Sequence, residues 1–544
     1  MTTRNTVDAS GRRHGAVATP HALATEAATE AIRDGGNAID AALAAAFVLT
    51  VVYPHNTALG GDLIALIRQP DGTITCVNSS GPASRNVDAA DFRRRYGDTM
   101  PVTGVDTITV PGAVAGLKAL HDFGAAREWS KHLTRAIELA SSGAPVAPSL
   151  GVAIKEQLAL VLGDPGLVAL LAPGGDPLLA GEILVQPALA RSLRTLAELG
   201  PSSLYGGELG RTLVAALAAM GGRLDNEDFA QFTPRLEEPL RRSFGSFAVW
   251  TSAPNSQGLL LLEILGALEA LGPERDPLGR DAGVLSELFR LASIDRDESL
   301  ADPDSMKFSS AEMLESARLE RLAHDALQRT EIPATPHSLG SSRPKGDTVA
   351  VVTADSEGRA VCLIQSVFHS FGAAILEPET GIVMHNRGSF FSLSPDSANQ
   401  LAPGRRPAHT LMPVMVTRGE NLAWVLGTMG GKAQPQILTQ VLLRLFAGES
   451  PLDAVTMPRW VIGGLEVDQV NELAYIESTV PVSARESIQA RLSVVDLPSH
   501  DEITGHAQVI AALEDDTFVA ASDPRSDGRG ETAGAAGIGL TPPL

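Results

Sequence analysis

The sequence predicts a large protein built from both helices and β-strands, and three observations support this prediction. Hydrophobic residues make up 44% of the 544 residues and charged residues 20%, which is the balance of a globular chain with a sizeable core. Residues 110–270 carry Leu and Ala at three- and four-residue spacing, which is typical of helices. Residues 348–366 contain two β-rich runs separated by a turn, which predicts a hairpin.

The first predicted elements are two helices. Residues 20–34 have a helical pattern that Gly35 is placed to end. Asn37 is a suitable N-cap for the next helix, because Asp40 follows three residues later as in a capping box. The second helix is rich in Ala and is expected to continue to about Val51.

Two strands are predicted to follow these helices. Residues 53–62, YPHNTALGGD, form a loop rich in Pro and Gly that leads into a strand at residues 63–68. The Asp71-Gly72 turn then separates this strand from another near residues 74–77.

A connector without periodicity precedes the predicted central hairpin. Residues 334–347, ATPHSLGSSRPKGD, are rich in Ser, Gly and Pro, so we expect them to be irregular and exposed. The first strand of the hairpin begins at Thr348, and the second covers about residues 360–366. Taken alone, this is an ordinary boundary between a loop and a strand.

Composition argues against several classes of partner. The chain has 43 Lys and Arg against 64 Asp and Glu, a net charge of −21. A field of this sign repels nucleic acid and anionic membranes, so we expect neither as a partner. Cys76 and Cys362 are the only cysteines, which is too few for a disulfide framework and leaves no CxxC zinc motif.

The N-terminal sequence predicts a soluble, cytoplasmic protein. The first fifteen residues are polar and contain no apolar region of the kind found in a secretory signal. Residues 41–52 are the most apolar early stretch, and they fall short of the roughly 20 residues that a membrane-spanning helix needs.

Several segments, in order along nearly the whole chain, resemble the γ-glutamyltransferase (γ-glutamyltranspeptidase) superfamily of N-terminal-nucleophile (Ntn) hydrolases. Each motif is weak alone, but their order is specific. The segments are Gly35-Gly-Asn-Ala-Ile-Asp-Ala-Ala42, Leu59-Gly-Gly-Asp62, Val110-Pro-Gly-Ala-Val-Ala-Gly116, Gly346-Asp-Thr348, Ser370-Phe-Gly372, Pro407, Gly430-Gly431, and Ser522-Asp-Pro-Arg525 with Asp527-Gly528.

This resemblance implies an α+β fold, the Ntn αββα four-layer sandwich of two mainly antiparallel sheets between helices. It also implies that the chain cuts itself between Asp347 and Thr348. The products would be a large subunit of residues 1–347 and a small subunit of residues 348–544, which stay associated as a heterodimer and together form one Ntn fold. The implied chemistry needs no cofactor and no metal, and the partner is a small-molecule substrate.

The resemblance makes Thr348 the catalytic nucleophile. A Thr hydroxyl needs a nearby base to remove its proton. At a new chain terminus the α-amine supplies that base, with an ordinary pKa of about 7.7–8.0. The sequence contains no GxSxG, HExxH or Walker motif that would offer another mechanism. The alternative is that Thr348 is simply a β-branched residue that begins a strand.

Two further positions match catalytic groups of the family. Ser366, on the second strand of the hairpin, matches a hydroxyl residue that supports the nucleophile, although it is equally typical of a strand serine. Gly430 and Gly431 follow an apolar strand at residues 422–426 and precede a predicted helix. Consecutive glycines there would allow backbone N–H groups to bind a developing oxyanion, and the alternative is a plain strand-to-helix turn.

Other positions depart from the γ-glutamyl pattern. Asn78 stands where the family has an Arg for the substrate α-carboxylate, and His409-Thr410 replace a serine pair. Arg387, Ser389 and Phe390 cover the stretch that normally holds the polar and acidic contacts. A substrate ammonium would meet Arg387 and a phenyl ring, and a buried unpaired charge is costly. We therefore expect Asn78, Arg387, His409 and Thr410 to line a different substrate site.

The altered motifs GDTV, HNRG, RPAHTLMP and GTMGG look more like the oxamate amidohydrolase branch. A substrate of that kind carries a carboxylate beside the scissile carbonyl, which Arg387 could bind in bidentate fashion. Arg387 could instead form an internal salt bridge, and His409 could be a structural residue.

Three other functions stay open at this point. The first is glutathione hydrolysis with γ-glutamyl transfer. The second is hydrolysis of a C–C bond that removes an oxalyl-type group, as in relatives that make 4-alkylproline antibiotics. The third is a binding role in a non-catalytic family member.

Overall fold

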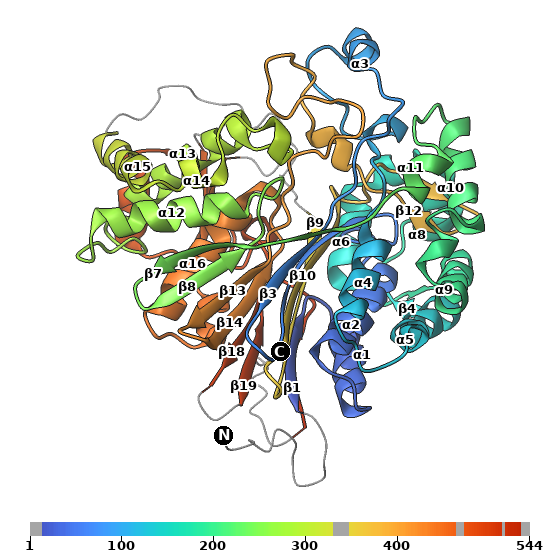
Figure 1. The fold of residues 1–544 in the computed structure, drawn as a ribbon, viewed down its shortest axis with the longest axis horizontal. Helices are drawn as coiled ribbons and strands as arrows, with labels where there is room; N and C mark the ends of the chain where they lie inside the picture. The colour runs from blue at the N-terminus through green and yellow to red at the C-terminus, as the bar shows by residue number, and fades with distance from the viewer. Residues whose placement is uncertain (1–13, 330–346, 464–472, 514–516, 535–544) are drawn as a thin grey trace.

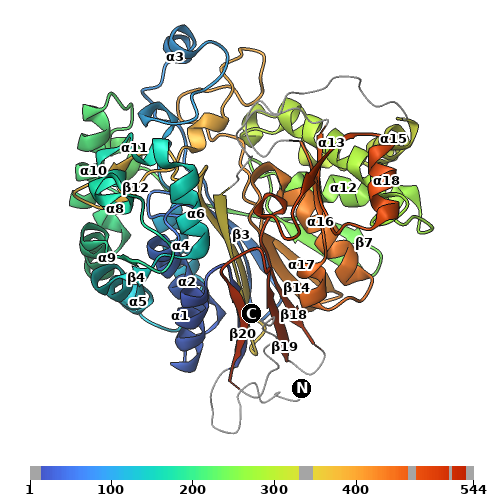
Figure 2. The same cartoon turned by 180° about the vertical axis from the view of Figure 1, so that it is seen from behind.

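The computed structural model describes residues 14–329, 347–463, 473–513 and 517–534. Two β-sheets lie face to face at the centre, and a set of helices covers the outer face of each sheet (Figures 1 and 2). This is the four-layer αββα arrangement that the sequence predicts.

The first sheet has seven strands, and every neighbouring pair is antiparallel. Its centre is the hairpin of β9 and β10, which is flanked by strands from the N-terminal part of the chain. In spatial order the strands are β20 (Arg529–Ala533), β1 (Gly15–Thr19), β9 (Asp347–Asp355), β10 (Ala360–Phe368), β2 (Asp62–Arg68), β3 (Ile74–Ser79) and β6 (Arg235–Glu237).

The second sheet has six strands and is also antiparallel throughout. In spatial order its strands are β19 (Phe518–Ser522), β18 (Ala507–Ala512), β14 (Asn421–Thr428), β13 (Val414–Arg418), β8 (Phe247–Thr251) and β7 (Leu240–Phe244). A smaller sheet of β15 (Trp460–Ile462), β16 (Leu473–Glu477) and β17 (Ser493–Leu497) lies beside it.

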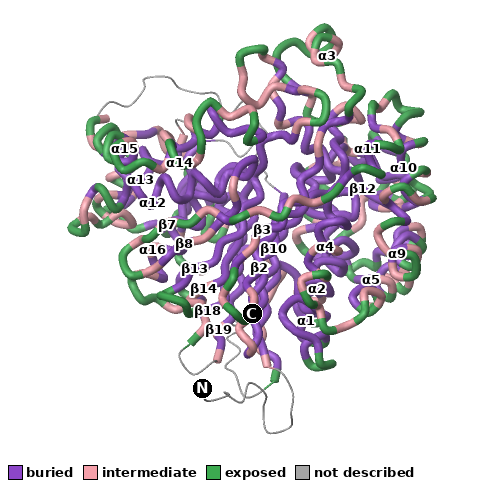
Figure 3. Tube along the Cα trace, in the orientation of Figure 1, coloured by how far each residue is buried: buried purple, intermediate pink, exposed green. Residues whose placement is uncertain are grey.

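Alternation along the strands explains why both faces of each sheet are buried. On β9, Ala350 and Val352 belong to the core between the sheets, together with Val425 of the second sheet. Val349 and Val351 point the other way, into the core shared with the N-terminal helices. The paired sheets are accordingly buried, and exposed residues are found mainly on the outer helices (Figure 3).

Two helical layers complete the sandwich. The layer on the first sheet contains α1 (Ala22–Arg33), α2 (Ala38–Val52) and α4 (Ala113–Asp122), with α5 (Trp129–Ser142) and α9 (Pro187–Leu199) outside them. The layer on the second sheet contains α12 (Gly258–Leu271), α16 (Gln434–Phe446) and α17 (Pro451–Thr456), with α13 (Ala282–Ser299), α15 (Ser316–Gln328) and α18 (Val482–Gln489) farther out.

The cap of α2 also anchors the central hairpin. Asn37 and Asp40 form the capping box that the sequence predicts. Asp355, at the end of β9, accepts a hydrogen bond from Ala38 N at 3.0 Å, and Thr353 Oγ1 donates to Ala38 O at 2.7 Å. The hairpin is thus fixed to the start of a buried helix.

The region predicted to be mostly helical also contains short strands. Residues 110–270 are mostly helical, as expected, but β6, β7 and β8 lie between residues 235 and 251. β6 pairs with β3 and β8 pairs with β13, strands far away in the chain, whereas β7 pairs with β8 across the turn at Gly245, which has a φ of 56°. Pairing with distant strands makes these residues extended, although the Leu and Ala spacing of the surrounding region predicts helices.

Other predictions match the structure or lie outside its described parts. The first two helices, the strands near residues 63–68 and 74–77, and the central hairpin are present within a few residues of the expected bounds. The connector at residues 334–346, including Gly346, and residues 1–13 lie outside the described residues. Among the helices described, none has both the length and the apolar character needed to cross a membrane.

Gly427 on β14 tests the contact between the two sheets. A Cβ atom there would lie 2.5 Å from Ile364 Cδ1 and 3.2 Å from Ala350 Cβ. We expect Gly427→Val to lower the free energy of unfolding by about 1–3 kcal/mol, since overpacking forces neighbours from their rotamers. Denaturant unfolding would measure this loss, with Asn421→Ala at the exposed end of the same strand as control. Equal stability of the two variants would contradict the close contact.

Candidate functional site

Thr348 and Ser366 lie opposite each other at the start of the central hairpin. Thr348 Oγ1 donates a hydrogen bond to Ser366 Oγ at 3.2 Å, and Ser366 Oγ donates to the carbonyl oxygen of Asp347 at 2.6 Å. Both hydroxyl side chains are buried. One serine hydroxyl therefore contacts the nucleophile candidate and also the carbonyl that this nucleophile would attack.

A β-bulge in β10 holds Ser366 in this place. The register between β9 and β10 shifts between Gln365 and Phe368. Phe368 has a φ of 82°, and its backbone N–H donates to Ser366 Oγ at 2.8 Å. The bulge thus adds a third hydrogen bond to the serine hydroxyl.

The loop before β2 supplies a residue that sequence reasoning missed. Asn56 Nδ2 lies 3.5 Å from Thr348 O, and Val367 N donates to Asn56 O at 3.0 Å. Its Oδ1 atom is buried and has no hydrogen-bond partner among the described atoms. The only signal in the sequence was its position in a Pro- and Gly-rich loop, which does not reveal a contact with a distant hairpin.

Arg387 is the second main feature of the site. It lies in a short 3₁₀ helix, η5 (Arg387–Phe390), and its side chain is fully buried. Its Nη1 atom donates to Thr410 Oγ1 at 3.1 Å, while Nε and Nη2 have no partner within the described part of the chain. Burial lowers the pKa of Arg387 to about 9, which leaves it cationic at neutral pH.

An aromatic ring supports this guanidinium. Arg387 Cζ lies 3.9 Å from the ring centroid of Phe368, and no described carboxylate comes within ion-pair distance of it. The internal salt bridge considered as an alternative from sequence is therefore not seen. The neighbouring ring of His369 stacks on Phe368 at 4.1 Å. Burial, with the charges of Arg387 and Lys432, lowers the pKa of His369 to about 3, so it is neutral.

Asp62, on β2, is a buried acidic residue whose carboxylate already has partners. It faces Ser366 in the β2–β10 register, and its carboxylate accepts from His409 Nε2 at 3.1 Å and lies 3.3 Å from His385 Nδ1. The N–H groups of Gly81 and Gly112 each lie 3.2 Å from its other oxygen. Burial raises the pKa of Asp62, but the two histidines outweigh this effect and hold it well below its usual range.

Both ring nitrogens of His409 have hydrogen-bond partners. Nε2 faces Asp62, and Nδ1 accepts from Leu411 N at 3.3 Å. Burial and the charge of Arg387 lower the pKa of His409 to about 3, so the ring is neutral. This geometry favours the structural role over direct contact with a substrate.

Asn78 reaches the site only through other side chains. Its Nδ2 atom donates to Asn255 Oδ1 at 3.0 Å and to Glu237 Oε2 at 3.2 Å, and its Oδ1 atom accepts from Ser80. Asn255 in turn donates to Pro407 O at 2.6 Å. Asn78 therefore supports the segment that carries His409 and Thr410, and its contact with a substrate stays a prediction.

The glycine pair lies where β14 passes into η6 (Gly431–Ala433) and α16. Gly430 has a φ of 141° and Gly431 a φ of 50°, values that favour glycine. Gln257 Nε2 donates to both Gly431 O and Thr410 O at 2.8 Å. One buried amide thus ties the candidate oxyanion turn to the hydroxyl residue that contacts Arg387.

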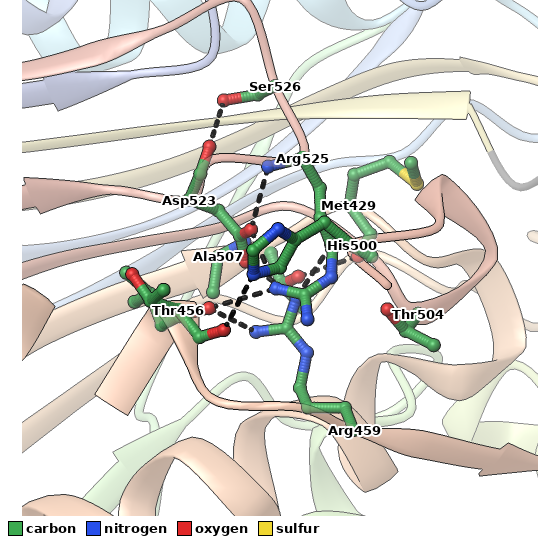
Figure 4. Close-up of polar contacts among 12 residues, drawn as sticks. Met429, Thr456, Arg459, His500, Thr504, Ala507, Asp523, Arg525 and Ser526 are labelled. Carbon is green, nitrogen blue, oxygen red and sulfur yellow. Dashed lines mark hydrogen bonds and ion pairs between the residues drawn. The ribbon is translucent and has the colours of Figure 1, made fainter. Parts of the chain in front are cut away.

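A buried ion network braces the strands behind the glycine pair. Arg459 and Arg525 both point toward Asp523 (Figure 4), at 2.6 and 2.9 Å. Arg525 also binds both carboxylate oxygens of Glu477, at 2.8 and 2.6 Å. All four side chains are completely buried. Two positive and two negative charges therefore compensate one another without solvent.

The network reaches the glycine pair through one turn. Arg459 Nη2 donates to Gly505 O at 2.8 Å, and Met429 N donates to the adjacent His506 O at 3.1 Å. Met429 immediately precedes Gly430. Sequence reasoning singled out Ser522-Asp-Pro-Arg525 only as a motif, because its partners lie in segments far apart in the chain.

The described residues contain no group of three or more His, Cys, Asp and Glu side chains arranged to hold a metal ion.

Comparison with known proteins shows which family and which individual proteins this chain resembles. The profile of the gamma-glutamyltranspeptidase family matches residues 24–533. The oxamate amidohydrolase proenzyme of Klebsiella pneumoniae subsp. pneumoniae is 32% identical, and the alignment covers 95% of this chain and 98% of that protein. The acylase ACY 1 proenzyme of a Pseudomonas species (strain V22) is 33% identical, with 96% and 93% covered.

A solved structure gives the same result for the fold. The cephalosporin acylase from Bacillus halodurans superposes with a TM-score of 0.85 at 29% sequence identity, and 97% of each chain is covered. The two-sheet sandwich described above is thus an Ntn-hydrolase fold.

The ion network predicts a pH-dependent loss of stability in Asp523→Asn. Removing one partner of a buried pair is expected to cost about 3–5 kcal/mol at neutral pH. Burial raises the pKa of Asp523, but Arg459 and Arg525 lower it to about 2, whereas an unfolded Asp titrates near about 3.9. The wild-type advantage is therefore complete above about pH 4 and decreases as the pH falls toward 2.

Urea unfolding of both proteins at neutral pH and near about pH 3 would measure this difference. Asp453→Asn, at an exposed helix start, serves as control. A difference between wild type and Asp523→Asn that stays the same at both pH values would contradict the charge compensation.

Proposed function

Because the chain belongs to the gamma-glutamyltranspeptidase family of Ntn hydrolases, we propose that it cuts itself before Thr348 and then hydrolyses a small α-oxo acid amide. Oxamate is the simplest such substrate. The observation that carries this proposal is the buried Arg387, whose Nε and Nη2 atoms form an unpartnered edge.

Self-cleavage would begin at the hydrogen bonds around Ser366. Thr348 Oγ attacks the carbonyl carbon of Asp347; its proton passes to Ser366 Oγ while Ser366 gives its own proton to the carbonyl oxygen. The tetrahedral intermediate then collapses to an ester: the C–N bond breaks, and the proton on the former carbonyl oxygen passes to the nitrogen, which becomes the α-amine of Thr348. Water then hydrolyses the ester and releases the Asp347 carboxylate. The names of the relatives as proenzymes support this processing.

The proposed subunits, residues 1–347 and 348–544, would stay together because both contribute to the same sheets. In the first sheet, β9 lies between β1 and β10, and β10 also pairs with β2. β1 and β2 come from the proposed large subunit. The cut separates only Asp347, the first residue of β9, so the pairs that residues 349–355 make with β1 and β10 are kept.

Turnover would use the same hydroxyl with a new base. The free α-amine of Thr348 takes the hydroxyl proton while Oγ attacks the substrate carbonyl. The backbone N–H groups of Gly430 and Gly431 are the proposed donors to the oxyanion. The leaving amine takes the proton, and water attacks the acyl-enzyme to release the acid. For oxamate the products are oxalate and ammonia.

Arg387 is proposed to determine the substrate specificity. The Nε and Nη2 edge of a guanidinium matches the two oxygens of a carboxylate, and burial strengthens such a contact. In oxamate this carboxylate is directly beside the scissile carbonyl. A γ-glutamyl substrate instead brings an ammonium, and the carboxylate of Asp62 is already in contact with His385 and His409.

The same carboxylate contact would serve the hydrolysis of a C–C bond that releases an oxalyl-type group. The proposed contact with Arg387 is therefore compatible with either scissile bond. A substrate screen should contain oxamate, N-oxalyl amides and an oxalyl C-acyl compound, with γ-glutamyl-p-nitroanilide for the glutathione hydrolase alternative.

Thr348→Ala should abolish self-cleavage, because it removes the attacking oxygen. Intact mass under denaturing conditions should give two fragments for the wild type, split between Asp347 and Thr348, and one full-length chain for the variant. Thr353→Ala, a buried threonine on the same strand, should still be cut and serves as control. A single uncut wild-type chain after long incubation would favour the non-catalytic alternative.

Arg387→Met should raise the KM for oxamate by about 30-fold or more, since truncating one partner of a buried charge contact costs about 2–5 kcal/mol. Self-cleavage should continue, because Arg387 makes no hydrogen bond to Thr348 or Ser366 within the described structure. Steady-state kinetics and intact mass would measure the two effects. Wild-type enzyme that releases p-nitroaniline from the γ-glutamyl compound but leaves oxamate intact would overturn the substrate assignment.

A further inference from the structure

Phe368 has a backbone conformation that aromatic residues rarely adopt. Its φ of 82° lies in the left-handed region, where the Cβ atom of an L-residue is crowded. Such a conformation is kept only where the surroundings require it, and these positions are concentrated at functional sites. Phe368 is also 3% exposed, so solvent does not account for its orientation.

The unusual conformation gives one residue two contacts in the site. The backbone N–H of Phe368 reaches Ser366 Oγ at 2.8 Å. Its ring at the same time lies 3.9 Å from Arg387 Cζ. In regular strand geometry successive side chains alternate between faces, so the bulge at this residue is what allows both contacts.

The ring stabilises the guanidinium in a way that a carboxylate would not. The face of an aromatic ring attracts a cation through the quadrupole of the ring, so this contact uses none of the N–H donors of the guanidinium. A carboxylate at this position would pair with the Nε and Nη2 edge and neutralise the charge. With the ring beneath it, Arg387 is stabilised while that edge stays without a protein partner.

The neighbouring aromatic side chain extends the same surface. Phe390, on η5, lies 5.5 Å from the Phe368 ring, and Lys432 Nζ lies 5.3 Å from the Phe390 ring. Lys432 directly follows the glycine pair. The two rings thus lie between two cationic side chains, which is an environment for an anion and not for an ammonium.

We propose that Phe368 is a positioning residue that determines specificity: its ring keeps Arg387 charged and open to a small acyl carboxylate, while its backbone fixes Ser366. This inference rests on the proposed function, because it assigns the substrate carboxylate to Arg387. It goes further by explaining why an acid is chosen over the amino-acid end of a γ-glutamyl compound.

Oxalate is the probe for this proposal, because it carries the carboxylate and has no amide to cleave. Titration calorimetry would compare matured wild type with Phe368→Leu, Phe368→Tyr and Phe368→Gly. Phe247→Leu is the matched control, since Phe247 also lies under an arginine, Arg418 at 4.7 Å, but in the second sheet. Intact mass would follow self-cleavage of every variant.

We expect Phe368→Leu to bind oxalate about 10- to 30-fold more weakly, because a desolvated cation–π contact is lost. Phe368→Tyr should restore binding to within about threefold of wild type, and Phe247→Leu should bind as wild type does. Phe368→Gly should lose affinity as Leu does but keep self-cleavage, because glycine adopts this φ freely and retains the N–H. With oxamate, the change should fall on KM and leave kcat within about twofold.

Unchanged oxalate affinity in Phe368→Leu would overturn the proposal. So would a loss of self-cleavage in proportion to the loss of oxalate binding, since that result assigns Phe368 a purely structural role. Failure of the proposed function has a different signature: the wild type would bind oxalate in a Phe368-dependent manner and leave oxamate uncleaved.

Discussion

The hydroxyl of Ser366 is the contact on which the proposed chemistry depends. It accepts from Thr348 and from the Phe368 backbone, and it donates to the carbonyl of Asp347. A hydroxyl has one proton to donate and two lone pairs to accept, so all of its capacity is used. The bulge in β10 and the position of β9 beside it bring these three groups within hydrogen-bond distance of Ser366 Oγ.

Compensation of buried charge distinguishes the site from its surroundings. Asp62 is held by two histidines and two backbone N–H groups, and Asp523 by two arginines. Arg387 has an aromatic ring and one threonine hydroxyl instead. Because a buried charge is costly without a partner, a cation in this state is matched to a ligand that brings its own negative charge.

Sequence patterns correctly predicted the structural features that depend on residues close together in the chain. The Asn37 cap, the central hairpin and the strand-to-helix turn at Gly430 are all within a few residues of their predicted places. The contacts of Asn56 and Phe368 were missed, because they need the register of a bulge and a loop from another part of the chain. The strands β6 and β8 were missed for a related reason, since their partners β3 and β13 lie far away in the chain.

In the proposed chemistry, self-cleavage and turnover are one reaction on two acyl groups. In both, the oxygen of Thr348 would attack a carbonyl: the carbonyl oxygen of Asp347 accepts from Ser366, and Gly430 and Gly431 are the proposed donors for the substrate. The Asp347 carboxylate formed by the cut is chemically an acid product at the position that a substrate acyl group must take. In the proposal this carboxylate has to withdraw before a substrate carbonyl can lie beside Thr348 Oγ. The pairs that the rest of β9 makes with β1 and β10 can stay as they are, because Asp347 is the first residue of that strand.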